Sequence, residues 1–166
     1  MKRNLLIVIV LILLRHSFSL SACTTVIISA KSSASGRPIM WKQRDTDSDK
    51  NKLLYFTGAK YDFIGMVSAG NTERTRVWMG MNHAGFCIMN SASYNINRET
   101  IDSGRYGEGS IMAMALPLCA TLEDFEHLLD TLTKPTALSA NFGVIDAMGG
   151  AAYYEVGYSH WIKFDV

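Results

Sequence analysis

Cysteine, proline and the motifs of metal and nucleotide sites are scarce or missing in this chain. Its 166 residues include three cysteines and three prolines, and the four histidines are scattered without the spacing of metal ligands. The sequence contains no Cys-x-x-Cys pair, no His-Glu-x-x-His motif, no Gly-x-Gly-x-x-Gly turn and no phosphate-binding loop. We therefore expect no metal and no cofactor.

The chain also lacks an excess of either charge. It carries 16 basic and 15 acidic residues, and the basic residues form no stripe or cluster. Proteins that bind nucleic acid usually show such a basic footprint. We therefore expect no nucleic-acid partner.

The longest apolar run lies at the N-terminus. Lys2 and Arg3 precede the apolar residues 5–14, and a polar stretch of small residues follows as far as Ala22. This is the order of regions in a secretory signal, and the run is shorter than the roughly 20 residues that span a membrane. We predict a signal peptide over residues 1–22, one domain over residues 23–166, and export to the periplasm or the exterior.

Removal of the signal would make Cys23 the first residue of the mature chain, which allows two exclusive interpretations. A free Cys23 carries a thiol and an α-amine whose reference pKa is about 7.7–8.0, so one residue can supply both nucleophile and base. However, Leu20-Ser21-Ala22-Cys23 also resembles a bacterial lipobox, in which the cysteine sulfur is lipidated. A lipidated sulfur cannot attack a substrate. The alternative is therefore a non-catalytic envelope lipoprotein, and only in that case do we expect contact with a membrane.

The other two cysteines occupy apolar segments. Cys87 lies in a strand-like run and Cys119 near the end of a helix-like run, where a buried cysteine behaves as a small hydrophobic residue. An odd number of cysteines leaves at least one thiol unpaired in an exported protein. We expect Cys87 and Cys119 to be buried thiols rather than a disulfide.

Periodicity and turn residues predict an α+β domain. Strands are expected at residues 24–30, 38–42, 53–56, 61–67, 76–81, 85–92, 142–147, 151–156 and 161–166, with turns at 70–72 and 82–85. Helices are expected at 111–116 and from the N-cap Thr121 to a point before Pro135. Strands interrupted by two helices indicate helices packed on one face of a largely antiparallel sheet. The first two strands can form a hairpin, which would return residues 42–45 to Cys23.

Three side chains could assist a nucleophilic Cys23. Asp45 could hold the α-amine, Lys42 could favour the thiolate by its charge, and Asn90 could donate a hydrogen bond to the oxyanion. Each has an ordinary structural interpretation as well. Asp45, Lys42 and Arg44 are typical of a solvated strand end, and Asn90 is typical of a residue that satisfies a neighbouring turn.

Taken together, these residues resemble a known family. Cys23-Thr24-Thr25, a strand, a Gly-x-Pro turn and Lys42-Gln43-Arg44-Asp45 are similar to the start of the N-terminal nucleophile (Ntn) hydrolases of the choloylglycine hydrolase and penicillin acyltransferase-like group. Residues 81–90 resemble the Asn-x-x-Gly turn of that group, which leads to an oxyanion-hole asparagine and falls on Asn90. Residues 141–155 resemble a later hairpin of the sheet.

The resemblance implies a fold class and an activity. The fold is an αββα sandwich, incomplete here, because family members are commonly longer and place a further active-site asparagine and arginine beyond the end of this chain. Lys42 stands where arginine is usual, and Gln43 where asparagine is common. The implied catalytic residues are Cys23, Lys42, Asp45 and Asn90.

The implied reaction is hydrolysis of a linear, non-peptide amide C–N bond through an acyl-enzyme. Release of the acyl group to an amine instead of water would make the protein an acyltransferase. The expected partner is a small acyl amide, such as a conjugated bile acid, an N-acyl amine or a small acylated amino acid. A homo-oligomer is left open.

Overall fold

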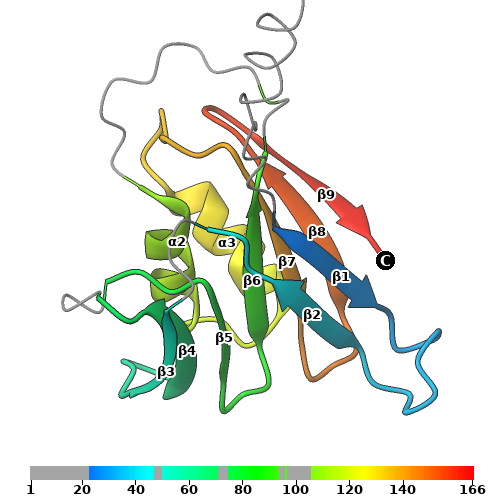
Figure 1. Ribbon diagram of the computed structural model, residues 1–166. Coiled ribbons are helices and arrows are strands. Elements are labelled where there is room, and N and C mark those ends of the chain that lie inside the picture. The colour runs from blue at the N-terminus through cyan, green and yellow to red at the C-terminus, as the bar shows by residue number, and fades with distance from the viewer. Residues whose placement is uncertain (1–22, 47–49, 71–74, 94–95, 97–105) are drawn as a thin grey trace, which may run out of the picture.

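The computed structural model describes residues 23–46, 50–70, 75–93, 96 and 106–166 (Figure 1). The expected signal peptide and most of the expected turn at residues 70–72 lie outside this part of the chain.

The centre of the molecule is a seven-stranded antiparallel sheet in which each strand pairs with the next along the chain. Its strands are β3 (Asn51–Phe56), β4 (Phe63–Ser68), β5 (Met79–Asn82), β6 (Cys87–Ala92), β7 (Ala140–Ile145), β8 (Ala151–Val156) and β9 (Trp161–Asp165). Two helices, α2 (Glu108–Ala115) and α3 (Leu122–Thr131), connect β6 to β7. The expected α+β order of elements is confirmed.

The first two strands form a separate hairpin. β1 (Thr24–Ile28) pairs antiparallel with β2 (Ile39–Gln43), in a register that sets Thr25 opposite Lys42. The loop between them is the polar stretch expected at 31–37. The prediction that the end of the second strand returns to Cys23 is confirmed.

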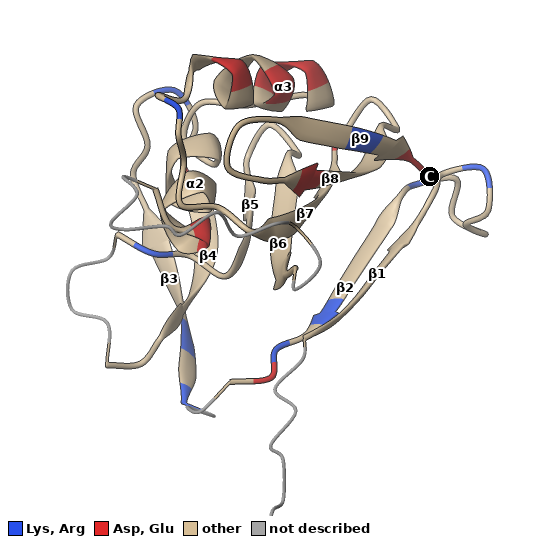
Figure 2. Ribbon diagram, turned by 90° about the horizontal axis from the view of Figure 1, so that it is seen from above, with Lys and Arg blue, Asp and Glu red and all other residues tan. Residues whose placement is uncertain are grey.

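The hairpin and the helices cover opposite faces of the large sheet (Figure 2). Alternate residues of β6 supply both interfaces, because successive side chains of a strand point to opposite faces. Ile88 packs in the core under the helices with Phe125, and Met89 packs with Ile27 of the hairpin. Helices, large sheet and hairpin are three layers of an αββα sandwich, which agrees with the expected incomplete fold.

Glycine at position 143 allows the hairpin to approach the sheet closely. A Cβ atom there would lie 2.8 Å from Cε of Met89 and 3.0 Å from Cδ1 of Ile27. Both distances are shorter than ordinary carbon–carbon contacts of about 3.5–4.0 Å. The absent side chain of Gly143 therefore makes room for the first strand.

The buried Asn82 organises the turn between β5 and β6. Its Nδ2 donates to the carbonyl oxygens of Leu116 and Cys119, both at 2.7 Å, and its Oδ1 accepts from the amides of Ala84 and Phe86, both at 3.1 Å. Gly85 completes the turn at φ +86°, in the left-handed region that glycine adopts without strain. The turn expected at residues 82–85 is confirmed.

Several predicted boundaries were wrong by two or three residues, and three of them bear on the site. Helix α2 begins at Glu108 rather than 111, because its first turn is polar and the prediction depended on the apolar residues that follow it. Strand β3 begins at Asn51 rather than 53. Strand β5 begins at Met79 rather than 76, because the amide of Val77 donates to the carbonyl of Gly109 at the start of α2 and not to a strand.

Candidate active site

A pocket of about 190 Å³ opens at the end of the hairpin where Cys23 lies. Its lining combines a thiol, two cations and two carboxylates with an amide and an indole ring. The lining residues are Cys23, Lys42, Arg44, Asp45, Thr46, Trp78, Asn90, Ala92 and Glu108. All four residues that the sequence analysis proposed for catalysis therefore share one pocket.

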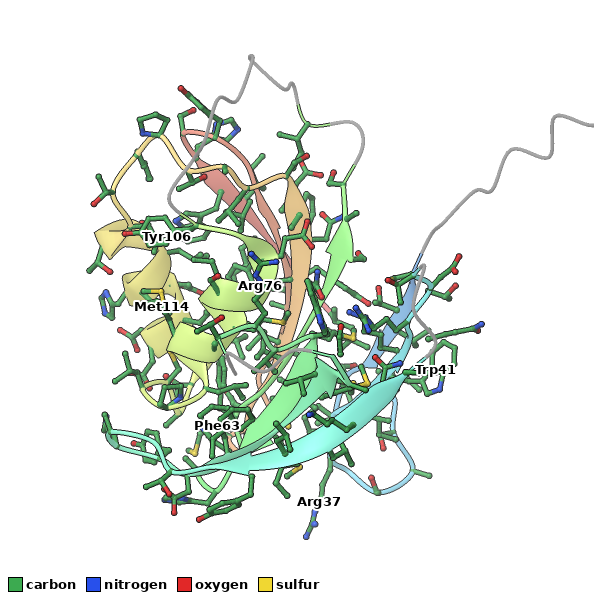
Figure 3. All side chains as sticks on the ribbon, turned by 60° about the vertical axis from the view of Figure 1, so that its left-hand side comes forward. Arg37, Trp41, Phe63, Arg76, Tyr106 and Met114 are labelled. Atoms are coloured by element: carbon green, nitrogen blue, oxygen red, sulfur yellow. The ribbon has the colours of Figure 1, made fainter. Side chains whose placement is uncertain are left out.

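The alternation of the hairpin strands aims these side chains at the large sheet. In β2, Met40 and Lys42 are partly buried while Trp41 is 48% exposed, and Trp41 lies on the outer side of the hairpin (Figure 3). In β1, Thr25 and Ile27 point inward in the same way. Cys23 continues this inward series by two residues.

Lys42 joins the hairpin to the large sheet. Its Nζ donates to Oδ1 of Asn90 at 2.7 Å and to the carbonyl oxygen of Trp78 at 2.9 Å. Strand β5 pairs with β6 only as far as the Met79–Met89 pair, so Asn90 lies just past the last paired position. Because β5 starts late, no strand pairing fills the position beside Asn90, and the ammonium group of Lys42 occupies it.

The side-chain amide of Asn90 is held from both ends. Its Oδ1 accepts from Lys42, and its Nδ2 donates to Oε2 of Glu108, the first residue of α2. An ammonium group only donates and a carboxylate only accepts, so these two partners fix which end of the amide carries the hydrogens. Asn90 is itself buried, with 4% of its surface exposed.

The environment of Lys42 weakens its hold on a proton. Burial lowers its pKa to about 8, and the nearby charge of Arg44 acts in the same direction, while Cys23 and Glu108 oppose the change. A cation with this pKa is mostly protonated at pH 7 and mostly neutral at pH 9. The interpretation of Lys42 as a solvated surface cation was wrong.

The three cysteines are all free thiols, but their surroundings differ. Burial raises the pKa of Cys87 to about 11 and that of Cys119 to about 12, so both are protonated at neutral pH. Cys23 lies in the pocket instead, with its Sγ 3.7 Å from the backbone carbonyl oxygen of Asp45. A thiolate is the reactive form of cysteine, so their raised pKa values make Cys87 and Cys119 poor nucleophiles.

Sequence reasoning missed Glu108 and the indole of Trp78. Glu108 follows a segment without helical periodicity in the sequence. It lies 18 residues after Asn90, and the packing of α2 brings the two side chains together. In the sequence, an acidic residue in the first turn of a helix indicates a favourable interaction with the helix dipole and not a catalytic role.

Within the described residues, no group of three histidine, cysteine or acidic side chains could hold a metal ion. Nor does that part of the chain contain a helix of sufficient length and hydrophobicity to cross a membrane.

The pocket residues fall within, or next to, a match to a known family. A family model described as acyl-coenzyme A:6-aminopenicillanic acid acyl-transferase matches residues 32–164. The chain belongs to this acyltransferase family. The matched segment contains Lys42, Asp45, Asn90 and Glu108 and begins after Cys23. A search of curated proteins finds no match.

Solved structures similar to this acyltransferase-family chain include two variants of the conjugated bile acid hydrolase from Clostridium perfringens. One has a TM-score of 0.62 at 13% identity, covering 87% of this chain and 51% of that one. The other has a TM-score of 0.54 at 12% identity, covering 72% and 44%. The chain thus spans about half the length of the structures it matches.

These comparisons confirm the resemblance to the Ntn hydrolases of the choloylglycine hydrolase and penicillin acyltransferase-like group, and with it the fold class. The family match covers residues 32–164, and the likeness to the bile acid hydrolases is a likeness of fold.

Proposed function

We propose that this protein cleaves linear, non-peptide amides with Cys23 as an N-terminal nucleophile, exposed by removal of residues 1–22. The observation that carries the proposal is the hydrogen bond of 2.7 Å between Lys42 and Asn90 beside Cys23. This bond joins β2 and β6, on which Lys42 and Asn90 are the predicted catalytic residues, and it lies in the pocket that Cys23 lines.

The first half of the proposed reaction forms an acyl-enzyme. The α-amine of Cys23 takes the thiol proton, and the thiolate attacks the carbonyl carbon of the amide, forming the C–S bond. The tetrahedral intermediate then collapses with cleavage of the C–N bond, and the protonated α-amine of Cys23 returns the proton to the leaving amine. In the second half, water attacks the thioester and releases a carboxylic acid, whereas attack by an amine would transfer the acyl group.

Lys42 and Asn90 assist at the two places where negative charge develops. The ammonium group of Lys42 favours the thiolate, and Asn90 stabilises the oxyanion. The amide nitrogen of Asn90 carries two hydrogens, of which the bond to Glu108 uses one. The second is the donor that we assign to the oxyanion, and Glu108 holds it in place.

Asp45 has the role of holding the α-amine. It lines the pocket two residues after the end of β2, and Cys23 contacts its backbone. A carboxylate that accepts a hydrogen bond from the amine would keep that base next to the thiol. Asp45 is thus an orienting residue in the proposed mechanism.

A comparison of cysteine variants tests the proposal. We expect Cys23→Ala to reduce hydrolysis of N-acyl amines to the background rate, measured as release of the free amine. The matched control is Cys87→Ala, which removes a half-buried thiol outside the pocket and should leave the rate within about twofold. Equal rates in Cys23→Ala and in the unaltered protein would contradict the proposal.

A further inference from the structure

Arg44 is a second cation of the pocket, and neutral groups hold it rigidly. Its guanidinium lies over the ring of Trp78, with Cζ 4.8 Å from the ring centroid. Its Nη2 donates to Oγ of Ser68 at 3.2 Å, and its Nη1 donates to Oδ1 of Asn51. Oγ of Ser68 also accepts from Nε1 of Trp78 at 3.2 Å, so the indole and the guanidinium are fixed against each other.

The charges of the two pocket cations are balanced differently. Glu108 acts on Lys42, raising its pKa against the effect of burial. For Arg44, burial lowers the pKa, and the only opposing charge recorded among the described residues is that of Cys23. All contacts recorded for the Arg44 guanidinium in that part of the chain are to uncharged groups. A planar, pre-oriented guanidinium at the pocket thus meets no carboxylate among the residues that the structure describes.

The geometry points to Arg44 as a substrate-binding residue that takes a carboxylate lying within a few bonds of the carbon that Cys23 attacks. This inference rests on the proposed function, because it assumes that the substrate is attacked by Cys23. A guanidinium offers five N–H donors in a fixed fork that matches the two oxygens of a carboxylate, and the contacts to Ser68 and Asn51 use only part of that fork. The pocket of about 190 Å³ leaves room for a small group only.

A merely structural role for Arg44 makes a different prediction. Its contacts link the hairpin to β3 and β4, so loss of the side chain would loosen the hairpin whatever the substrate carries. Such loosening would affect charged and neutral reagents alike. A carboxylate-binding role changes the preference between them.

Alkylation of Cys23 by two nearly isosteric reagents separates these roles. Iodoacetate and iodoacetamide both react by displacement of iodide by the thiolate, and only iodoacetate carries a carboxylate. We would measure the rate of each reaction at Cys23 in the purified protein by peptide mass spectrometry, and take the ratio of the iodoacetate rate to the iodoacetamide rate. The ratio cancels any change in the reactivity of the thiol itself.

We expect Arg44→Gln to lower this ratio about tenfold, the factor that corresponds to one charge-assisted contact in a partly solvated pocket. Arg44→Lys keeps the charge without the fork and should lower the ratio by less, which also serves if Arg44→Gln fails to fold. The matched control is Arg37→Gln, because Arg37 is exposed in the loop at the far end of the hairpin and points away from the molecule (Figure 3). That variant should keep the ratio of the unaltered protein.

Two results would overturn the inference, and they are distinguishable. If Cys23 reacts but the ratio is the same in Arg44→Gln and in the unaltered protein, Arg44 does not bind the carboxylate, while Cys23 remains a competent nucleophile. If neither reagent modifies Cys23 in the unaltered protein, the proposed function fails, and the assignment of Arg44 fails with it.

Discussion

Replacement of Lys42 by methionine should make the protein more stable at neutral pH while it abolishes activity. Lys42 is kept charged in a partly buried position, where its pKa is about 8 instead of 10.5. A pKa lowered by folding means that the charged form is less favourable in the folded chain than in the unfolded chain. Methionine has a similar length and carries no charge that must be desolvated.

The size of the effect follows from the change in pKa. A difference between 10.5 and about 8 corresponds to about 3 kcal/mol at pH 7, since each pKa unit is worth about 1.4 kcal/mol. The unfolded chain holds more protons than the folded chain between these two values, so stability of the unaltered protein rises with pH across that window. The charge of Lys42 destabilises the folded chain fully below pH 8, and this destabilisation disappears as the pH rises from about 8 to 10.5.

The assay is urea denaturation of both proteins at pH 7 and at pH 10. We expect the stability advantage of Lys42→Met over the unaltered protein to shrink by about 2–3 kcal/mol between the two pH values. Comparing the two proteins removes the contribution of other titrating groups that they share. The hydrogen bonds that Lys42 makes to Asn90 and Trp78 offset part of the gain at pH 7, but they do not produce this pH dependence. A difference in stability that is the same at both pH values would show that the charge of Lys42 does not destabilise the folded chain.

Three further changes test other parts of the structure. Glu108→Gln removes the carboxylate that raises the pKa of Lys42, so Lys42 should lose its proton at a lower pH. Since the proposed reaction needs a charged Lys42, the alkaline limb of the pH–rate profile should move to lower pH, and a profile that does not move would count against the contact. Asn82→Ala leaves buried backbone groups without partners and should lower the free energy of unfolding by about 3–5 kcal/mol in urea denaturation; a loss under about 1 kcal/mol would disagree. Gly143→Ala places a methyl group against the hairpin and should cost about 1–3 kcal/mol in the same assay, with slower alkylation of Cys23; an unchanged alkylation rate would show that the hairpin does not need this close approach.

Local sequence patterns predicted the strands and the hairpin well, because their information lies in neighbouring residues. The β-branched run after Cys23, the polar loop at 31–37 and the apolar run in β2 define a hairpin without reference to the rest of the chain. The antiparallel register then brings Lys42 and Asp45 back to Cys23. The same locality explains the turn at Asn82 and Gly85, whose residue types demand it.

Contacts between distant elements were harder to predict. Glu108 reaches Asn90 only because α2 packs across the end of β6, and no local pattern encodes that packing. The late start of β5 depends on the bond between Val77 and Gly109, which likewise joins distant elements. Arg44 has the sequence of a solvated strand end, and its stacking on Trp78 follows from the tertiary fold.

Mass spectrometry of the N-terminal peptide, on protein purified from its native cells and mixed briefly with an N-acyl amine, tests directly whether Cys23 is the nucleophile. Before mixing, we expect an N-terminus at Cys23 with a free thiol. After mixing, we expect a mass increase equal to the acyl group on the same residue. A diacylglyceryl adduct on Cys23 would instead establish the lipoprotein alternative, and a free Cys23 that never acquires the acyl group would contradict its role as the nucleophile.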